Sequence, residues 1–476
     1  MYNLDMQTLI SFLIESDELV IKMTNLFRDF CRYLNFFIIA AIIVFIFLAW
    51  YYLLFLICAF KKPIIYPTGE TKYKYAVLVP ARNEDKVIRN CLDSLKKQDY
   101  PKDKFDVYVI IESKSDPTYR ITMSYGSNFH VIVRKHLTNR RTKGFALDEA
   151  FHYIEDNGLV YDALMIFDAD NVVSPNYITI MNNTKNAGFQ IATGYRNFTN
   201  ATVNRVSSCS AILFSFMNNF TSNGRSRLFK KCTLTGTGYY IDYNIVKNEG
   251  GWIWNGMTED VELTCYSYYH NISMTYNQSA VYYDEQATQY HVLHKQHVRW
   301  VWGFFASKKR FKQKTFDYGC NKGAKKSLAK MEYNFSIYPF VALCIVELLA
   351  CLLGFALFIS DLIIASLVEP GIWADASANP QTVFCWFLLS FFYLYFLFML
   401  ASSLTFIIDN KRLKFSGGKI VVCIFSYLFF FMDFLLAFFD GLNHPKKRKS
   451  WDKIEHSGDV ANNEAIKKIN EKKKSR

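Results

Sequence analysis

Three polar motifs follow one another along the chain and could act together in one reaction. The first is an acidic pair, Asp168 and Asp170, which directly follows the apolar run Leu164 to Phe167. Two carboxylates at the end of a buried strand can converge on one cation, and hard oxygen ligands suit Mg²⁺ or Mn²⁺. Such a cation could be shared with a pair of phosphates. The alternative is that this loop is acidic only because it is solvated.

The second motif is another acidic pair, Glu259 and Asp260, about ninety residues later. Aromatic and apolar residues flank it between Trp254 and Leu263, and they would hold a carboxylate away from bulk water. A carboxylate in such a place can take the proton of an attacking sugar hydroxyl. The alternative is a helix N-terminus, with Thr258 as the cap and the acids in the first turn.

The third motif, Gln296 to Trp300, presents an amide, a guanidinium and an indole at the spacing of one helical turn. Arg299 could hold a diphosphate, and Trp300 could stack on the face of a sugar. The alternative is an Arg/Trp anchor at a membrane interface.

The central region alternates between short apolar runs and a helical pattern. Such alternation predicts a mostly parallel sheet with crossover helices, in which ligands bind beyond the carboxyl ends of the strands. The predicted strands are Tyr75 to Val79, Val107 to Ile111, Val131 to Val133 and Ala163 to Phe167, and the first predicted helix is Lys86 to Leu95.

The composition indicates a membrane protein, because 51% of the 476 residues are hydrophobic and only 20% are charged. An apolar stretch of about 20 residues is long enough to cross a bilayer as a helix. Buried core helices are the alternative, but they rarely run so far without polar residues. The stretches that meet this length are Phe36 to Phe60, Ile337 to Leu367, Thr382 to Ile408 and Ile420 to Phe439.

The net charge of +13 comes from Lys and Arg beside the apolar stretches and in the C-terminal tail. This distribution favours the positive-inside rule and contact with anionic lipid over nucleic-acid binding. It predicts a cytoplasmic catalytic region. The basic run Lys446 to Lys449 should also lie inside the cell, but a single crossing by the last apolar stretch would place it outside. One apolar stretch would therefore be a hairpin, an interfacial helix or a miscounted pair of crossings.

The eleven cysteines are scattered, with no CxxC pair and no Cys/His cluster at metal spacing. We therefore expect reduced thiols, and neither a disulfide framework nor a zinc site.

In this order, and ahead of a C-terminal apolar block, the motifs resemble those of the processive family 2 glycosyltransferases, which include the bacterial cellulose, hyaluronan and poly-N-acetylglucosamine synthases. The resemblance covers about residues 75 to 305. It implies an α/β catalytic domain of the GT-A type, a UDP-sugar donor, inversion at the anomeric carbon, Mg²⁺ or Mn²⁺ as the cofactor, and a transmembrane channel for the growing polymer.

The resemblance also implies a role for each motif residue. Asp260 would be the catalytic base, with Glu259 beside it, and Asp170 would bind the metal. The nucleotide-sugar would be contacted by Pro80, Arg82, Glu84, Glu112, Lys143 and Asp168. The acceptor end and the diphosphate would be held by Thr235, Gly236, Thr237, Gly238, Gln296, Arg299 and Trp300.

The chain departs from the family pattern in two places. Many relatives have an Asp pair after the second strand, where this chain has Glu112 within Ile111 to Asp116. The family's basic pair after the Gly-Thr loop is replaced by Tyr239 to Asp242. These departures leave the uracil contact and part of the acceptor contact open.

The expected fold is a GT-A α/β glycosyltransferase domain combined with an α-helical transmembrane bundle. The expected segments are an N-terminal segment, interfacial or soluble, over residues 1–34, a transmembrane helix over 35–60, a cytoplasmic catalytic domain over 61–335, a transmembrane bundle over 336–441 and a basic tail over 442–476.

The expected function is polymerisation of UDP-glucose or UDP-N-acetylglucosamine into a β-linked extracellular or capsular polysaccharide, with its translocation, by a multi-pass plasma-membrane enzyme. Its partners would be the UDP-sugar, the growing polysaccharide and the lipid bilayer, but no nucleic acid; accessory secretion subunits stay open. One alternative is non-processive transfer of one sugar to a lipid phosphate. Another is an inactive membrane partner that senses nucleotide-sugars.

Overall fold

The computed structural model describes residues 54–135, 142–315 and 380–444, together with scattered helical positions between Lys22 and Ile43. The chain divides into two compact units, one formed by Met1–Leu53 with Phe335–Leu397 and the other by Leu54–Asn334 with Phe398–Arg476. The second unit contains the sheet and the polar motifs. The predicted N-terminal segment, the apolar stretch Ile337 to Leu367 and the basic tail lie wholly or largely outside the described residues.

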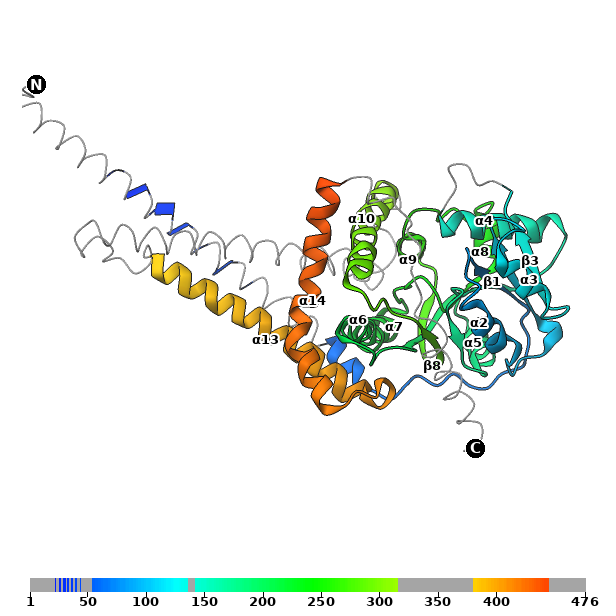
Figure 1. The fold of residues 1–476 in the computed structure, drawn as a ribbon, viewed down its shortest axis with the longest axis horizontal. Coiled ribbons are helices and arrows are strands. Elements are labelled where there is room, and N and C mark those ends of the chain that lie inside the picture. Colours follow the sequence, from blue (N-terminus) through cyan, green and yellow to red (C-terminus); the bar gives the residue numbers. More distant parts are fainter. Residues whose placement is uncertain are drawn as a thin grey trace, which may run out of the picture. The chain divides into compact units, whose positions relative to one another are not determined.

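The second unit is built on an eight-stranded sheet with the order β3-β2-β1-β4-β7-β6-β8-β5 (Figure 1). The strands are β1 (Tyr75–Pro80), β2 (Phe105–Ile111), β3 (Phe129–Val133), β4 (Ala163–Ile166), β5 (Val172–Val173), β6 (Ile191–Phe198), β7 (Tyr239–Asp242) and β8 (Met274–Asp284).

The predicted strands are confirmed, and they form the parallel half of this sheet. Strands β1, β2, β3 and β4 pair in parallel with one another. The other half is mixed, because β7 runs antiparallel to both β4 and β6, while β6 and β8 are parallel. The expectation of a mostly parallel sheet is therefore met on one side of β4 only.

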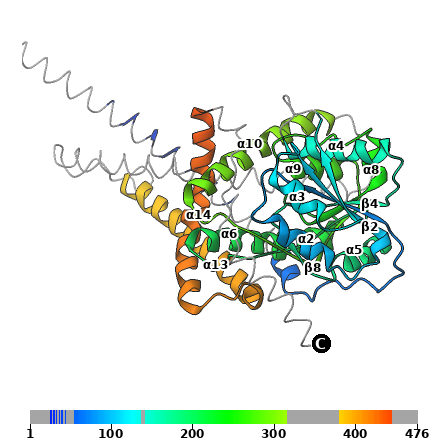
Figure 2. The same ribbon diagram turned by 45° about the vertical axis from the view of Figure 1, so that its right-hand side comes forward.

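Helices cover both faces of the sheet (Figure 2). Residues of α2 and α5 pack on one face, and residues of α4, α8 and α9 pack on the other. The helices are α2 (Ile88–Lys96), η1 (Lys102–Lys104), α3 (Pro117–Met123), α4 (Lys143–Asp156), α5 (Tyr177–Asn186), α6 (Arg205–Phe216), η2 (Met217–Ser222), α7 (Asn223–Phe229), α8 (Tyr243–Asn248), α9 (Glu259–Tyr269), α10 (Tyr290–Thr315), α13 (Pro380–Leu413) and α14 (Gly417–Asn443).

Strand β1 is apolar throughout because it is covered on both faces. Side chains alternate between the two faces of a strand, so a strand covered on both faces needs apolar residues at every position. Ala76 and Leu78 belong to the cluster under α4, whereas Tyr75, Val77 and Val79 belong to the cluster under α2.

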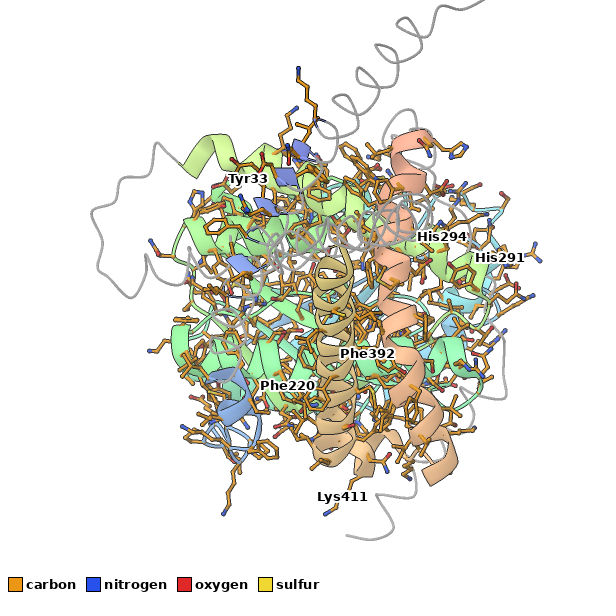
Figure 3. The ribbon with its side chains drawn as sticks, turned by 90° about the vertical axis from the view of Figure 1, so that its left-hand side faces the viewer. Tyr33, Phe220, His291, His294, Phe392 and Lys411 are labelled. Atoms are coloured by element: carbon orange, nitrogen blue, oxygen red, sulfur yellow. The ribbon has the colours of Figure 1, made fainter. Side chains whose placement is uncertain are left out.

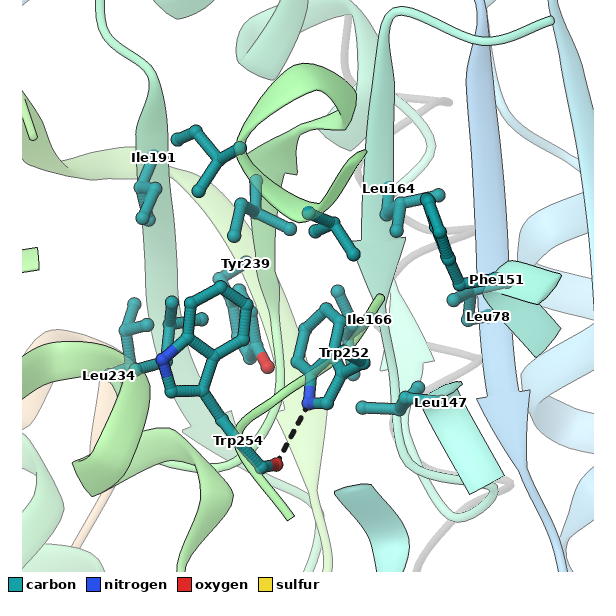
Figure 4. Close-up of a cluster of buried hydrophobic side chains, with 14 of the residues drawn as sticks. Leu78, Leu147, Phe151, Leu164, Ile166, Ile191, Leu234, Tyr239, Trp252 and Trp254 are labelled. Atoms are coloured by element: carbon teal, nitrogen blue, oxygen red, sulfur yellow. Dashed lines mark hydrogen bonds between the residues drawn. The ribbon is translucent and has the colours of Figure 1, made fainter. Parts of the chain in front are cut away.

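The cluster under α4 also holds the loop that leads into α9 (Figure 4). Trp252 and Trp254 are buried in it, and the indole N–H of Trp252 donates to the carbonyl of Trp254 at 3.0 Å. The start of α4 lies against this loop, because the hydroxyl of Thr142 donates to the carbonyl of Asn255 at 2.8 Å. A side chain at Gly144 would overlap the Trp254 carbonyl, so glycine permits the close approach.

The C-terminal part of α13 joins the sheet domain through a buried carboxylate. Asp409 accepts hydrogen bonds from the hydroxyls of Tyr195 and Ser215 and from the amide of Asn219 at 3.0 Å. Because an unpaired buried carboxylate is costly, these donors hold this helix end on β6 and on the α6–η2 turn.

Helix α14 is the one helix among the described residues that is long and apolar enough to cross a membrane by length and composition. The predicted stretch Ile420 to Phe439 lies within it, and the stretch Thr382 to Ile408 lies within α13. The multi-span bundle and the multi-pass location therefore stay predictions.

We expect Gly238→Ala to destabilise the fold more than Gly158→Ala. Both residues have φ of +64°, but an added Cβ would overlap the ring of Tyr282 at Gly238 and meet nothing within 4 Å at Gly158. Left-handed strain costs about 1–2 kcal/mol in both variants. Overpacking adds about 1–3 kcal/mol at Gly238 only. Denaturant unfolding measures the difference, and equal losses would show that the tyrosine ring moves aside.

Candidate active site

The predicted motifs meet beyond the ends of β1, β2 and β4 and at the N-termini of α4 and α9. The central contact is made by Lys143, the first residue of α4. Its ammonium lies 2.5 Å from Oδ1 of Asp168, 3.6 Å from Oε1 of Glu259 and 2.7 Å from the carbonyl oxygen of Gly236. One buried cation thus links the acidic pair after β4, the Gly-Thr loop and the acidic pair of α9.

Charge explains why this lysine stays protonated inside the protein. Burial on its own lowers the pKa of Lys143, but the charges of Asp168 and Glu259 outweigh it, so that the pKa is raised. The raised pKa favours the positively charged form of Lys143 beside the two acidic motifs.

Glu259 and Asp260 begin the first turn of α9, where Glu259 is buried and Asp260 is half-buried. Burial raises the pKa of both carboxyls, and that of Glu259 reaches about 7, with Lys143 opposing the rise. Glu259 faces the ammonium, whereas Oδ2 of Asp260 lies 3.8 Å from where a Cβ on Gly236 would be. The two acids therefore face different parts of the site.

The alternative of a simple capped helix is only partly right. Helix α9 does begin after Thr258 with acids in its first turn, where the helix dipole favours negative charge. The hydroxyl of Thr258, however, makes no capping hydrogen bond and pairs with the hydroxyl of Ser307 at 3.1 Å.

The third motif lies on α10. Burial lowers the pKa of Arg299, while the charges of Glu259, Asp168 and Asp260 act in the opposite direction, so its guanidinium lies in the field of the acidic residues. Trp300 makes an edge-to-face contact with Phe214, with ring centroids 5.9 Å apart. Gln296 is half-buried on the same helix.

The loop after β1 meets the loop after β2. Nε of Arg82 lies 3.1 Å from Oε2 of Glu112, and this ion pair is partly exposed. Asp116 accepts from the backbone N–H of Asn83 at 2.7 Å, and the N–H of Glu84 donates to Thr118 at 3.2 Å. The structure thus brings Pro80, Arg82, Glu84 and Glu112 to one edge of the sheet.

Asp170 fits part of a site for a divalent cation. It is half-buried beside Asp168, and one of its oxygens accepts from the amide of Asn171 at 3.1 Å. Magnesium is usually bound through one or two carboxylates together with substrate phosphates. Over the described residues, no cluster of three or more acidic, His or Cys side chains forms a metal site. The donor set therefore fits a cation shared with a diphosphate.

A buried network that the sequence reasoning missed supports the acidic loop. Asn171 donates to Asp284 at 2.9 Å and accepts the N–H of Asp168 at 3.1 Å. Arg196 donates to Asp284 at 3.0 Å and to the carbonyl of Thr235 at 2.9 Å. Asp284 is 3% exposed, so it has no role in solvation. The signal in the sequence was a carboxylate that directly follows the short run Ala280 to Tyr283 at the end of β8.

The Gly-Thr loop is bound into the same network. The hydroxyl of Thr237 accepts the N–H of Asp168 at 2.9 Å, and Gly238 pairs with the end of β4 through Ile166 at 2.9 Å. The guanidinium of Arg196 lies 3.9 Å from the ring centroid of Phe214, the residue that Trp300 also contacts. The structure therefore brings all three motifs and the Gly-Thr loop together.

A sheet covered by helices on both faces, with acidic motifs at the ends of its central strands, defines an α/β fold of the GT-A type. Residues 73–303 match the family model described as "Glycosyltransferase like family 2". This part of the chain is therefore a glycosyltransferase family 2 domain.

Two curated relatives carry glycosyltransferase names. The probable glycosyltransferase YdaM of Bacillus subtilis is 28% identical over 239 residues, which cover 48% of this chain and 55% of the relative. The poly(ribitol-phosphate) beta-N-acetylglucosaminyltransferase TarS of Staphylococcus aureus is 38% identical over 66 residues, which cover 14% of this chain and 12% of the relative. The chain thus spans about half or less of the length of these relatives.

Among solved structures, the mannosyltransferase PcManGT from Pyrobaculum calidifontis, in complex with GDP-Man and Mn²⁺, is similar with a TM-score of 0.53. The alignment covers 83% of this chain and 99% of that protein at 15% identity. Identity this low supports the fold alone.

The raised pKa of Glu259 predicts a pH-dependent stability. Its pKa of about 7 in the folded protein lies above its ordinary value of 4.5, so the folded state binds this proton more tightly than the unfolded state. The stabilisation is complete below the ordinary value and is lost as the pH rises through about 7. We expect Glu259→Gln to flatten the fall of the melting temperature over this range.

Thermal unfolding between acid and neutral pH measures this slope. Glu249→Gln, on a residue outside the acidic cluster, should keep the slope of the unchanged protein. An unchanged slope in Glu259→Gln would mean that this carboxyl is already ionised at low pH.

Proposed function

We propose that the chain is an inverting glycosyltransferase that transfers a sugar from a UDP-sugar to a hydroxyl of a growing polysaccharide at a membrane. The observation that carries this proposal is the contact of Lys143 with Asp168, Glu259 and the Gly236 carbonyl. It joins the motifs assigned to donor, acceptor and proton transfer within one ion-pair network.

Asp260 is the proposed catalytic base. Its Oδ1 accepts the N–H of Val261 at 2.8 Å, while Oδ2 faces the Gly-Thr loop at Gly236. Glu259 is instead directed to Lys143. Burial raises the pKa of the Asp260 carboxyl and so makes the carboxylate a stronger base.

The proposed transfer is a single displacement. Asp260 takes the proton of the acceptor hydroxyl, and the oxygen forms a bond to the anomeric carbon from the face opposite the leaving group. The bond between that carbon and the phosphate oxygen breaks, UDP leaves with the electron pair, and the configuration inverts. No covalent sugar–enzyme intermediate is needed.

Two cationic side chains would stabilise the leaving diphosphate. Lys143 and Arg299 both lie in the field of the acidic residues, and preorganised positive charge is most effective in a buried site. A divalent cation bound at Asp170, with Asp168 nearby, would neutralise further charge on the diphosphate. Trp300 would lie against the acceptor sugar.

We further propose that the enzyme extends a polymer by adding many sugars in succession. The motif Gln296 to Trp300 and the apolar helices after it support a processive synthase that uses UDP-glucose or UDP-N-acetylglucosamine. Addition of single sugars to an acceptor that already exists is the second candidate. The short match to TarS, whose name specifies N-acetylglucosamine transfer to poly(ribitol-phosphate), favours it.

We expect Asp260→Asn to lower sugar transfer by about 10²–10⁴-fold and to leave UDP affinity nearly unchanged, because the base acts on the acceptor. Radiolabelled transfer and UDP titration measure the two effects. Asp156→Asn, at the exposed end of α4, is the control and should behave like the unchanged protein. Substantial transfer by Asp260→Asn would overturn the assignment of the base.

For Asp170→Asn we expect weaker UDP binding in the presence of Mn²⁺ and unchanged binding in its absence, because the substitution removes a proposed cation ligand. Titration of UDP with and without Mn²⁺ checks this. The same loss of affinity under both conditions would place Asp170 in direct contact with the nucleotide instead.

The donor and the product are tested with the full chain purified into lipid. We expect labelled UDP-glucose or UDP-N-acetylglucosamine, but not both, to give a high-molecular-weight product that a glycosidase degrades. Lipid-linked or singly glycosylated product would favour the second candidate, and UDP binding without turnover would indicate an inactive sensor.

A further inference from the structure

A carboxylate lies within the apolar helix α14. Asp433 is 1% exposed, although its neighbours on the helix are almost all apolar. A buried carboxylate costs several kcal/mol unless it is well hydrogen-bonded, and ionisable residues in long apolar helices generally serve a function. The bonds that Asp433 makes therefore indicate what it is for.

Within the part of the chain that the structure describes, three donors to Asp433 come from α10, the helix that carries Arg299 and Trp300. The hydroxyl of Tyr290 donates at 2.5 Å to Oδ1, Nδ1 of His294 donates at 2.7 Å to the same oxygen, and Nδ1 of His297 donates at 2.6 Å to Oδ2. Figure 3 shows His294 beside α14. The two carboxylate oxygens thus bind α10 at three points.

The spacing of these donors matters for the orientation of α10. Tyr290, His294 and His297 follow one another at intervals of four and three residues, so they share one face of the helix. A three-point attachment along one face fixes both the rotation of α10 and its position along α14. Arg299 and Trp300 lie within one turn of this attachment.

His297 carries the constraint to the motif itself. Its ring stacks on Phe434 with centroids 3.9 Å apart and contacts the ring of Trp300 at 5.4 Å. Its Nε2 is buried and has no hydrogen-bond partner among the described residues, so Nδ1 and Asp433 set the orientation of the ring.

The end of α10 beyond this motif is attached to the helix of the proposed base. Ser307 pairs with the hydroxyl of Thr258 at 3.1 Å, and Arg310 lies 3.1 Å from Glu262. Helix α10 is thus held at α14 by Asp433 and at α9 beside Asp260.

We propose that Asp433 is a positioning residue of the transferase, which acts through His297 to hold Arg299 toward the acidic residues of the site and Trp300 against Phe214. The apolar helix α14 is thereby part of the catalytic machinery rather than an anchor alone. This inference rests on the proposed function, because Arg299 and Trp300 are taken to bind the diphosphate and the acceptor.

The test uses Asp433→Leu and Asp433→Asn in the full chain in lipid. A small misplacement of binding groups can cost about 10²-fold in rate, so we expect Asp433→Leu to lower kcat by about 10–10²-fold. UDP affinity in Mn²⁺ should fall by a smaller factor than kcat, because Arg299 is the proposed diphosphate contact on α10, whereas the other proposed nucleotide contacts lie on other elements. Asp433→Asn should lose less, since its amide oxygen still accepts and its NH₂ can donate to an imidazole nitrogen.

Asp409→Asn is the matched control, because Asp409 is also a buried carboxylate near the end of an apolar helix but is bonded to Tyr195, Ser215 and Asn219. We expect it to lower the melting temperature while kcat per folded molecule is unchanged. If kcat falls equally in Asp409→Asn and Asp433→Leu, a general loss of structure explains both and the proposal is wrong.

A double-mutant cycle tests the route through His297. If Asp433 acts through this ring, His297→Gln combined with Asp433→Leu should lower kcat little more than Asp433→Leu alone. Multiplicative losses in the double variant would show that the two residues act independently.

Hydrogen exchange of the segment Tyr290 to Trp300 separates this inference from the proposed function. We expect faster exchange in Asp433→Leu but not in Asp409→Asn, whether or not a sugar is transferred. Faster exchange in a chain that shows no transfer would retain the positioning role and overturn the proposed function. If Asp433→Leu is active and both its exchange rate and its kcat are unchanged, the proposed function is retained and the positioning role of Asp433 is overturned.

Discussion

The ion pairs of Lys143 are the interaction on which the site depends. Asp168, Glu259 and Asp260 are acids in or near the interior, and such groups need compensating positive charge. Lys143 supplies part of it, and Arg299 adds a second cation from α10. The result is a balanced cluster in which Glu259 remains close to its titration point at neutral pH.

The packing around the cluster is arranged to allow these contacts. Gly144 lets the start of α4 approach the Trp254 carbonyl, which brings Lys143 to the N-terminus of α9. On the opposite side, Asp284 and Asn171 hold the acidic loop after β4. The first arrangement depends on a close backbone approach and the second on buried polar pairs. Both restrict the conformations that these loops can adopt.

Helix α10 relates this cluster to the apolar part of the second unit. It carries Arg299 toward the acidic residues, bonds to α9 through Ser307, and bonds to α14 through His297 and Asp433. A carboxylate within an apolar helix needs hydrogen-bond partners, and such residues generally serve a function. The partners of Asp433 lie on α10, the helix that carries the predicted substrate motif. The apolar helix and the site are therefore parts of one packed structure.

Sequence alone determined the parallel strands and the residue types of the site, because local apolar runs and short acidic motifs report directly on strands and on charge. It did not reveal the mixed half of the sheet, where β7 enters between β4 and β6 and runs antiparallel to both. The partners of the motifs also needed the tertiary structure: Asp284 lies 113 residues from Asn171 in the chain, and Asp433 lies 136 residues from His297. Such pairings arise from packing between distant elements, and no local pattern encodes them.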